Sequence, residues 1–560
     1  MPESKLKFLI PTIGAVVAIT GGIAAYLYLK TPVGDSTGAL GSAKVVPATA
    51  LMATYINTDP QAWEKLKQFG TPEAQNLITK GLEKFNQDAF KESNISYETD
   101  LKPWVGGVMI AVLPPNSVKP AQLNTPGDQL NQPTNPQSEP NVLVVVGIKD
   151  KLGALNFGNK LKSQKGVKFT ETDYKGEKIT ETREQGKPTY SVVLNNSQLV
   201  LAPEKKGIEQ AIDTFKGQPS FAGKEGASTI LAKGVDVKNS LAQIYVPDYA
   251  GMVQQLITSN PQATQLPPQT LNQLKLVKSM VAGVGVDDGG VRLKAIANLD
   301  PQLNKFQYQN APANIVGQFP ADTLALVSGQ GISRSWSLLL EQSKDYPEFN
   351  QAVEQVRQQL KATANLDLDK EVIGWMNQEF AIAAIPSNQG ILASVGVGGA
   401  FVFDTSDRKT AESTLTKLDD LIKRQSVTVA NRNVGGKDIT EWQTPQGAVL
   451  SHGWLDQDTL LVAVGGPIAD AIATAKNQPL DNSETFKAVT SSLQKPNGGY
   501  FYLDMDKTVT LINRFPGQSL PPDASTILAS IRGLGVTATS PDKSTSELEM
   551  LLALKPKTTK

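Results

Sequence analysis

The only histidine of the chain, His452, is the first residue to test for chemistry. It lies in the stretch LSHGWLDQD, next to Ser451 and four residues before Asp456. An imidazole can accept a hydroxyl proton near neutral pH, so the three residues invite a nucleophile–base interpretation as a hydrolase. Neighbouring residues of a strand point to opposite faces, however, and Ser451 should not meet His452. The sequence therefore favours a strand-surface histidine, and a hydrolase that uses His452 is kept only as a remote alternative.

Three acidic residues alternate in the stretch NLDLDKE, at Asp367, Asp369 and Glu371. Calcium prefers such hard oxygen ligands, and three carboxylates could line one edge of a calcium site. The stretch has no EF-hand glycine at the required spacing. The favoured interpretation is a solvated face, and we expect no bound metal.

Two further stretches resemble ligand loops only superficially. Asp287, Asp288, Gly289 and Gly290 stand between two predicted strands, where Asp-Gly is typical of a hairpin turn. The stretch VGVGGA, at residues 395–400, lacks both the lysine and the strand–helix context of a phosphate-binding loop. The chain contains no cysteine, which excludes disulfides, thiolate nucleophiles and cysteine-based metal sites. We predict no cofactor and no enzymatic activity.

Composition limits the classes of partner. The 54 basic and 54 acidic side chains cancel, which removes the usual long-range attraction toward nucleic acid. The length of 560 residues is too great for one ordinary hydrophobic core, so two or more domains are expected. We therefore predict a multidomain globular protein that does not bind nucleic acid.

An uncharged apolar run occupies residues 8–29, from Phe8 to Leu29. As a helix it would be about 33 Å long, which matches a bilayer hydrocarbon core of about 30 Å. The run is longer than the apolar part of a cleavable signal peptide and ends in a poor cleavage site. The sequence predicts an uncleaved transmembrane anchor whose partner is the lipid bilayer.

Charges flanking this run predict its orientation. Lys5 and Lys7 precede the run, whereas Lys30 and Asp35 nearly offset each other after it. By the positive-inside bias, a short tail at residues 1–7 is cytoplasmic and the rest lies across the membrane.

Small residues repeat every four positions within the run, at Gly14, Ala18 and Gly22. Such a face lets another helix approach closely, so helix pairing is one interpretation. The favoured one is that Gly and Ala are simply common in membrane helices.

Several segments occur twice, in the same order. IEQAIDTFKGQP at residues 208–219 matches IADAIATAKNQP at residues 468–479 at seven of twelve positions. VPATAL at residues 46–51 recurs as FPADTL, and YKGEKIT at residues 174–180 recurs as VGGKDIT. NISYETDLKPW at residues 94–104 recurs as NLDLDKEVIGW. We interpret the exported part as a tandem duplication.

This duplication predicts the domain organisation. A flexible linker at residues 30–45 is followed by repeat 1 at residues 46–305 and repeat 2 at residues 306–560. Residues 115–140 are rich in Pro, Asn and Gln, so they are predicted to be a disordered loop in repeat 1. Each repeat alternates short apolar strands, hairpins and amphipathic helices. In repeat 1, the continuous apolar stretch at residues 141–148 predicts a strand buried on both faces, and hairpin turns are expected at Lys175-Gly176 and Asn195-Asn196. Ile208, Ala211, Ile212 and Phe215 are expected to form one apolar helical stripe that packs on the sheet. The predicted fold class is α+β: a transmembrane helix followed by two homologous α+β domains with mostly antiparallel sheets.

Four tryptophans recur in pairs, Trp63 with Trp336 and Trp104 with Trp375. Tryptophan anchors interfaces well, so Trp104 and Trp375 could mark a paired docking pocket. The favoured alternative is that each closes the joint between the helices and the sheet of its own repeat. The recurring residues are mostly core and turn residues, which favours a duplicated scaffold over a duplicated active site.

The stretches TDPQAWEKLKQFGTPEAQ, at residues 58–75, and DLKPWVGG, at residues 100–107, resemble a cyanobacterial family of single-span proteins with an exported domain of unknown function. The resemblance covers nearly the whole chain past Val46 and includes no catalytic residues. It implies that the bulk of the protein lies in the periplasm or the thylakoid lumen.

Two functions stay open. The first is a membrane-anchored, extracytoplasmic binding or scaffold protein that contacts envelope or thylakoid membrane proteins. The second is a carrier of an apolar ligand, such as a lipid or a pigment, held between helices and a curved sheet.

Overall fold

The structure is a computed structural model, and it describes residues 37–77, 79–80, 95–114, 141–163, 167–184, 187–258, 268–514 and 520–557. The predicted span at residues 8–29, with Gly14, Ala18 and Gly22, lies outside these residues, as does the predicted loop at residues 115–140. Among the helices in the described ranges, none is long and apolar enough to cross a membrane. The tail and the anchor therefore stay predictions.

The fold is a mixed α+β arrangement with large antiparallel sheet structure, which confirms the predicted class. The chain divides into two compact units. Unit 1 comprises Met1–Lys65 and Asn76–Val286, and unit 2 comprises Leu66–Gln75 and Asp287–Lys560. The predicted boundary between residues 305 and 306 separates the two sequence repeats, whereas the division at Val286 and Asp287 separates compact units. The repeat boundary therefore stays a prediction.

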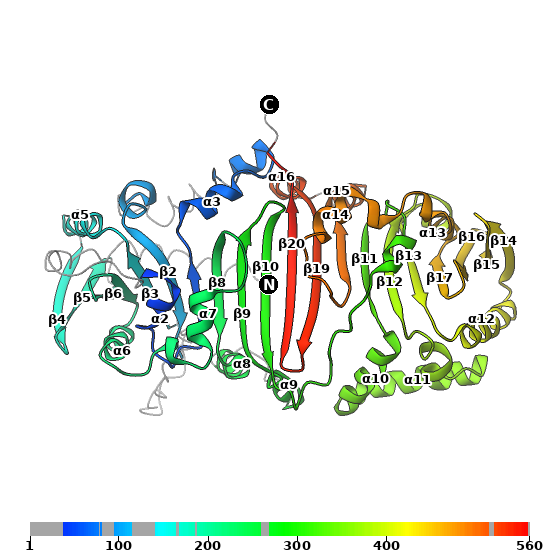
Figure 1. Ribbon diagram of the computed structural model, residues 1–560, viewed down its shortest axis with the longest axis horizontal. Coiled ribbons are helices and arrows are strands. Elements are labelled where there is room, and N and C mark those ends of the chain that lie inside the picture. Colours follow the sequence, from blue (N-terminus) through cyan, green and yellow to red (C-terminus); the bar gives the residue numbers. More distant parts are fainter. Residues whose placement is uncertain are drawn as a thin grey trace, which may run out of the picture. The chain divides into compact units, whose positions relative to one another are not determined.

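The sheet of unit 1 is built from strands paired antiparallel throughout (Figure 1). In spatial order they are β4 (Lys168–Tyr174), β5 (Glu177–Glu184), β6 (Lys187–Leu194), β7 (Gln198–Ala202), β3 (Val142–Ile148), β2 (Val105–Val112), β1 (Met52–Ile56), β8 (Ser240–Val246) and β9 (Val277–Val286). Every residue of β3 is buried, as its continuous apolar character predicted.

Helices of unit 1 connect and cover these strands. They are α2 (Ala39–Ala43), α3 (Pro60–Leu66), η3 (Tyr97–Leu101), α5 (Lys151–Lys162), α6 (Lys205–Phe215), η4 (Phe221–Gly223), α7 (Ala227–Lys233), α8 (Tyr249–Thr258) and α9 (Pro268–Leu274). The side chain of Asp150 caps α5 by accepting the N–H of Leu152 at 3.0 Å.

The sheet of unit 2 is also antiparallel throughout (Figure 1). Its spatial order is β14 (Thr428–Val434), β15 (Lys437–Thr444), β16 (Gly447–Trp454), β17 (Thr459–Val464), β13 (Val397–Asp404), β12 (Glu379–Pro386), β11 (Ala325–Gln330), β18 (Tyr500–Asp504), β19 (Ile531–Asp542), β20 (Thr545–Leu554) and β10 (Gly290–Leu299).

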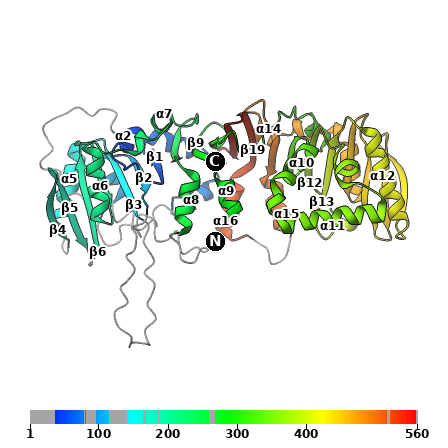
Figure 2. The ribbon, with the colours of Figure 1, turned by 90° about the horizontal axis from the view of Figure 1, so that it is seen from below.

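Helical segments of unit 2 are more numerous. They are η5 (Asn314–Gln318), α10 (Ile332–Gln342), η6 (Ser343–Asp345), α11 (Pro347–Ala364), η7 (Leu368–Ile373), η8 (Gly390–Leu392), α12 (Arg408–Lys423), α13 (Gly466–Ala473), η9 (Ala475–Asn477), η10 (Leu480–Asn482), α14 (Glu484–Thr490), α15 (Met505–Ile512) and α16 (Pro522–Ala529). In this unit, α14 covers one face of the sheet, whereas α11, α15 and α16 lie on the other side (Figure 2).

Strand order agrees between the units. The order β4-β5-β6-β7-β3-β2-β1-β8-β9 of unit 1 corresponds, strand for strand, to β14-β15-β16-β17-β13-β12-β11-β18-β19 of unit 2. The predicted hairpin turns of unit 1 lie where the sequence placed them. Lys175 and Gly176 have φ of 53° and 81°, and Asn195 and Asn196 have φ of 49° and 53°. Asn and Gly tolerate this left-handed region best, which explains their use at such turns.

The helix that recurs in the sequence packs on the sheet of its own unit. In α6, Ile208, Ala211 and Ile212 are fully buried, as predicted from their spacing. Phe215 was expected in the same stripe but is 36% exposed at the last residue of the helix, and Lys216 Nζ lies 5.4 Å from its ring centroid. In unit 2 the α-helix ends at Ala473, and the stripe continues into η9.

Ten residues from the first half of the sequence belong to unit 2. The backbone of Gly70 donates to Lys555 at 2.8 Å, and Lys557 donates back to Gln68 at 2.9 Å. Thr71 also donates its N–H to Ser530 Oγ at 3.1 Å. The sequence repeats did not predict that these ten residues belong to unit 2, because the assignment depends on contacts between segments nearly 500 residues apart.

Candidate functional site

A π-helix precedes a buried tryptophan at matching positions in both units. Tyr97–Leu101 forms η3 and Leu368–Ile373 forms η7, at the spacing of 271 that relates Trp104 to Trp375. π-Helical turns are rare and often occur at functional sites, so these two elements are candidates for such a site. The stretches YETDLKPW and LDKEVIGW carried the signal, but nothing in their composition identified the turn as a π-helix.

A carboxylate and a lysine fix each π-helix in the same way. In unit 1, Asp100 accepts the N–H of Ser96 at 2.8 Å, and Lys160 Nζ of α5 lies 2.7 Å from the same carboxylate. In unit 2, Glu371 accepts the N–H of Asp367 at 2.8 Å. Lys417 of α12 supplies the corresponding ammonium group at 2.6 Å. The shared arrangement ties the turn before each tryptophan to the next helix.

Both tryptophans that follow the π-helices are buried. Trp104 is 2% exposed, packs on Phe157 with ring centroids 5.4 Å apart, and donates Nε1–H to the Asp100 carbonyl at 2.7 Å. Trp375 is 4% exposed and meets Phe403 edge to face at 5.7 Å, and its Nε1 has no hydrogen-bond partner among the described residues. Neither indole is therefore accessible to a partner in this structure.

Trp63 and Trp336 occupy different environments despite their matching positions in the sequence. Trp63 is 41% exposed and donates Nε1–H to the carbonyl of Asn57 at 2.7 Å. Trp336 is partly buried and donates to Oδ1 of Asp369, also at 2.7 Å. The two indoles thus have different partners, and the described residues around them form no shared site.

The acidic residues considered as an edge of a calcium site bond to the protein instead. Asp367 caps η7 through the N–H groups of Asp369 and Lys370, both at 3.0 Å. Arg357 Nε lies 2.9 Å from Asp369 Oδ2. Burial alone would raise the pKa of Asp369, but hydrogen bonds from Arg357 and Trp336 hold it below its usual value. In the described part of the chain, no group of three acidic or histidine side chains could hold a metal ion.

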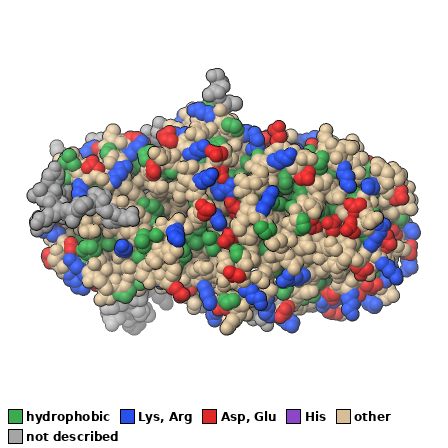
Figure 3. Space-filling view, viewed as in Figure 1, with side chains coloured by type: hydrophobic (Ala, Val, Ile, Leu, Met, Phe, Trp, Pro, Cys, Tyr) green, Lys and Arg blue, Asp and Glu red, His purple; other side chains and the backbone are tan. Residues whose placement is uncertain are grey.

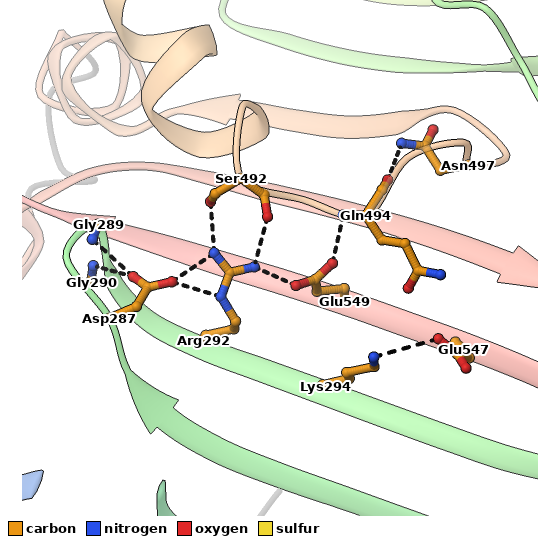
Figure 4. A network of polar contacts seen from close by, with 10 residues as sticks. All are labelled: Asp287, Gly289, Gly290, Arg292, Lys294, Ser492, Gln494, Asn497, Glu547 and Glu549. Atoms are coloured by element: carbon orange, nitrogen blue, oxygen red, sulfur yellow. Dashed lines mark hydrogen bonds and ion pairs between the residues drawn. The ribbon is translucent and has the colours of Figure 1, made fainter. Parts of the chain in front are cut away.

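The turn from Asp287 to Gly290 is likewise occupied by internal bonds (Figure 4). Asp287 Oδ1 accepts the N–H groups of Gly289 and Gly290 at 2.8 and 3.2 Å. Its other oxygen accepts Arg292 Nε at 2.7 Å. Its carboxylate therefore stabilises the hairpin turn and also pairs with the buried Arg292.

Arg292 is the centre of a buried polar cluster in unit 2 (Figure 4). Its guanidinium is 8% exposed and bonds Asp287 and Glu549 from two sides. Ser492 Oγ accepts Nη2–H at 2.6 Å, and Glu549 in turn accepts the N–H of Gln494 at 2.7 Å. The cluster satisfies every charge it buries, which indicates a structural role.

His452 does not lie on the strand surface, as the sequence had suggested, but is buried with 5% exposure. Its Nε2 lies 2.9 Å from Oδ1 of Asp419 on α12, and the same oxygen accepts Trp442 Nε1–H at 2.6 Å. Helix α12 covers this face of β16, a tertiary contact that the local sequence does not reveal. Ser451 pairs with Ala463 on the neighbouring strand and faces the other side of the sheet. Ser451, His452 and Asp456 therefore form no catalytic constellation.

The glycine-rich stretch at residues 395–400 leads into a strand. Gly396 has φ of 75° and β13 begins at Val397. A phosphate-binding loop would lead into a helix whose N–H groups face the phosphate, so this stretch offers no such site.

A buried acid, Glu379, and a partly buried acid, Asp404, lie on adjacent strands of unit 2. Glu379 is 5% exposed and accepts the N–H groups of Ala313 and Ile315. The pairing of Phe380 with Phe403 places it beside Asp404, which accepts the Thr459 hydroxyl at 2.7 Å. Burial raises the pKa of Asp404 to about 6; the bond from Thr459 opposes the rise and the charge of Glu379 adds to it. The pKa of each acid is raised, and both carboxyl groups accept hydrogen bonds from neighbouring residues of the chain.

An exposed apolar sheet face in unit 2 is the feature left without internal partners. Val327 is 44% exposed, Ile382 37% and Phe501 38%. These residues are directly paired neighbours on β11, β12 and β18. Contiguous apolar patches that are exposed to solvent often mark binding surfaces. This face is therefore the candidate functional site.

The sequence interpretation missed this face. A strand such as FAIAAI is apolar on both faces, which is typical of a strand covered on both sides. Here Ala381 and Ala383 are buried in the core, while Ile382 points away from it. The available signal was the apolar character of both faces of this strand.

Charged side chains of both signs are interspersed on the face of the molecule seen in Figure 3, in keeping with a formal net charge of zero. This view shows no extended area of one sign that would attract nucleic acid.

Comparison with known proteins gives a family and distant structural neighbours. A family model described as "Protein of unknown function (DUF3352)" matches residues 12–554. No curated protein matches the sequence. Crystal forms IV and III of TP0453 each align with a TM-score of 0.25 and 10% identity. They cover 46% of this chain and 80% and 79% of theirs, a likeness too distant to carry an argument.

Proposed function

This chain belongs to the DUF3352 family, and from that premise we propose that it is a membrane-anchored, extracytoplasmic binding or scaffold protein without a reaction of its own. The exposed apolar face of unit 2 is the observation that carries the proposal. Val327, Ile382 and Phe501 expose large apolar side chains on adjacent strands, at a cost that a protein normally avoids. A bound partner would remove that cost.

The internal bonding of the polar candidates supports a binding role over catalysis. His452, Asp369, Glu371 and Arg292 are each bonded to other groups of the chain. A catalytic group needs a free hydrogen-bonding position for the reacting atom, whereas these side chains bond to other residues of the chain. The hydrolase alternative based on His452 therefore has no geometric support.

The location follows from the N-terminal sequence. We propose that residues 8–29 span the membrane, that the tail at residues 1–7 is cytoplasmic, and that both units lie in the periplasm or the thylakoid lumen. The resemblance to cyanobacterial single-span proteins supports either of these two compartments. Protease added to the extracytoplasmic side should remove both units and spare a tag on the tail. Protection of the units in intact vesicles of the opposite orientation is the control.

The matching strand orders support a duplicated scaffold. We propose that both units descend from one ancestral α+β unit, with the shared carboxylate–lysine arrangement around Trp104 and Trp375 retained for stability. Binding would then have been added to unit 2 through its apolar face.

Photocrosslinking in native membranes tests the binding role. A benzophenone amino acid at Phe501 should give one dominant crosslinked species, because this side chain lies in the proposed contact surface. Leu152, which is 51% exposed on α5, is the matched control position and should give none. Equal crosslinking from both positions, or none from Phe501 in native membranes, would contradict the proposal.

A carrier of an apolar ligand such as a lipid or pigment is the second candidate. It is favoured by the chemistry of the face, which offers hydrocarbon and no hydrogen-bonding side chain in its exposed centre. Organic extraction of the purified full-length protein, followed by mass spectrometry, should then release a stoichiometric apolar molecule. A protein carrying Ile382→Glu should release less of it than the wild type.

A further inference from the structure

We propose that the apolar face of unit 2 binds one acyl chain of an anionic membrane phospholipid, with Arg532 beside the headgroup phosphate. The inference deepens the proposed binding function and rests on it, since it names the ligand class of the same face. It is argued from the register of the strands, the exposure of their side chains and the distribution of charge.

Six apolar side chains form one continuous row across six adjacent strands, which we call the apolar row. Direct pairing joins each member to the next, from β20 through β19, β18, β11 and β12 to β13. In that order the row consists of Met550, Val536, Phe501, Val327, Ile382 and Phe401. At a strand spacing of about 4.8 Å, the row is about 24 Å long. That exceeds the roughly 15 Å that acyl chains of one leaflet span in a bilayer.

The opposite face of these strands is filled, whereas Val327, Ile382 and Phe501 at the centre of the row are exposed. The outer members Met550, Val536 and Phe401 are partly buried, and Phe401 packs against the cluster that contains Trp375 and Phe403. Tyr500 and Tyr502, which flank Phe501, are buried beside Phe486 of α14. The row therefore faces the side on which α11, α15 and α16 lie (Figure 2). Neither α15 nor α16 contains a fully buried residue, although both helices pack on β19. Ile527 of α16 is itself 43% exposed and adds to the open apolar surface.

Hydrocarbon is the occupant that this surface fits. Every strand of the row except β13 and β20 is paired on both edges within the row, and these two pair with β17 and β10 beyond it. A partner strand could therefore find no free backbone edge to extend. The six side chains also offer no hydrogen-bond donor or acceptor beyond a thioether, whereas protein interfaces form about one hydrogen bond per 100–200 Å². An acyl chain needs none.

An arginine lies to one side of the row, on the same face of β19. In β19, buried and less buried residues alternate, and Arg532 falls on the same side as Leu534 and Val536. A bulge between Ile531 and Gly533 interrupts the register there. Arg532 lies four residues before the row, about 13 Å along the strand.

Arg532 has no counter-charge in the described part of the chain, where it forms neither an ion pair nor a hydrogen bond. Nearby lysines differ in this respect, because Lys507 pairs with Asp504 and Lys555 pairs with Asp506. A guanidinium binds phosphate oxygens through two parallel N–H groups. An apolar surface with an uncompensated cation about 13 Å to one side of it is complementary to a hydrocarbon chain joined to a phosphate.

The corresponding row of unit 1 is smaller and less exposed, which assigns the site to unit 2. There, Thr54 takes the place of Val327, flanked by Ile110 and Ile244 on the paired strands. Ala282 follows Ile244 in the position of Val536. None of these four side chains is among the exposed large hydrophobic residues of the described chain. The polar threonine interrupts the row at its centre.

Lipid transfer measures the proposed binding directly. The full-length protein is purified in detergent and then reconstituted into vesicles at low density. These vesicles are mixed with donor vesicles of phosphatidylcholine that contain phosphatidylglycerol with a fluorescent acyl chain. The wild type should bind this lipid saturably, and Ile382→Glu should weaken binding at least tenfold. Val395→Glu is the matched control, because Val395 is 51% exposed outside the row, and it should stay within twofold. Val327→Asn provides a milder second variant if the glutamate variant unfolds, as judged by circular dichroism.

Headgroup selectivity tests the role of Arg532. Arg532→Gln should reduce the preference for labelled phosphatidylglycerol over labelled phosphatidylcholine at least fivefold, with phosphatidylcholine binding unchanged. Arg424→Gln, which alters an exposed arginine at the end of α12, should leave the preference intact. Equal loss for both lipids would overturn the assignment of the phosphate to Arg532.

The outcomes separate this inference from the function on which it rests. If Phe501 crosslinks to a protein while Ile382→Glu leaves lipid binding unchanged, the lipid is rejected and the binding function stands. If the wild type neither binds the labelled lipid nor crosslinks from Phe501, both are rejected. Saturable binding that is lost in Ile382→Glu and kept in Val395→Glu supports both.

Discussion

Lys417 Nζ lies 2.6 Å from Oε1 of Glu371, while the other oxygen of the same carboxylate accepts the N–H of Asp367 at 2.8 Å. One side chain thus caps the π-helix before Trp375 and connects it to α12. Lys160 and Asp100 form the equivalent contact in unit 1 at 2.7 Å. The repetition of a rare turn with its own counter-ion indicates that the arrangement stabilises the joint between helix and sheet.

This arrangement predicts unequal effects for its two members. Lys417→Met should lower the free energy of unfolding by no more than about 0.5 kcal/mol, because the ion pair is partly exposed and screened by solvent. Glu371→Ala should cost about 1–2 kcal/mol, because it also leaves the capped N–H without a partner. Urea unfolding, with hydrogen exchange of the amides of η7 as a local probe, measures both. The prediction fails if the lysine variant is the more damaging of the two.

The two buried indoles should respond differently to shortening. Trp104→Phe removes volume and the hydrogen bond to the carbonyl of Asp100, whereas Trp375→Phe removes volume and an N–H that has no partner among the described residues. Trp104→Phe should therefore cost about 1 kcal/mol more. Hydrogen exchange of β2 and β12 reports the two units separately. Equal losses would indicate that packing on Phe157 and Phe403 outweighs the hydrogen bond.

Replacing Arg292 should strongly destabilise unit 2. Arg292→Met leaves the carboxylates of Asp287 and Glu549 buried without their cation, which typically costs about 3–5 kcal/mol. Lys294→Met is the matched control on the same strand, since Lys294 lies 3.6 Å from Glu547, and it should cost less than about 1 kcal/mol. Thermal unfolding of the two variants measures the difference. Similar melting temperatures would show that the buried cluster is not a principal source of stability.

Local patterns predicted the elements of this fold well. The continuous apolar run of β3, the turns at Lys175 and Asn195, and the stripe around Ile208 all lie where periodicity and turn chemistry placed them. Each depends on residues close together in the sequence, so no tertiary information was needed. Phe215 shows the limit, because periodicity does not tell where a helix extends past its sheet.

Contacts between distant segments could not be predicted in the same way. His452 is buried because α12 crosses its strand and brings Asp419 to it. The apolar row depends on the register of six strands, and its exposure depends on which helices fail to cover it. A single sequence encodes the apolar residues but not their coverage, so it does not identify Ile382 as an exposed side chain.

The acid pair of Glu379 and Asp404 predicts a stability change with pH. Burial raises the pKa of Asp404 to about 6, above its value in an unfolded chain of about 3.9. Burial also raises the pKa of Glu379, against the hydrogen bonds from Ala313 and Ile315. The folded state therefore holds more protons than the unfolded state between about pH 4 and pH 6. Stability from this source is present below that range and is lost as the pH rises through it.

Asp404→Asn should remove this loss while keeping an acceptor for the hydroxyl of Thr459. At pH 7.5 the variant should be more stable than the wild type by about 1–2 kcal/mol, less than the full shift implies because solvent reaches the site. Near pH 4 the two should unfold alike. Asp407→Asn gives a control of opposite sign, because bonds from Thr410 lower the pKa of Asp407 and its charge stabilises the folded state. Urea unfolding at both pH values decides the matter, and an Asp404→Asn variant that gains nothing at pH 7.5 would show that Asp404 is ionised without penalty.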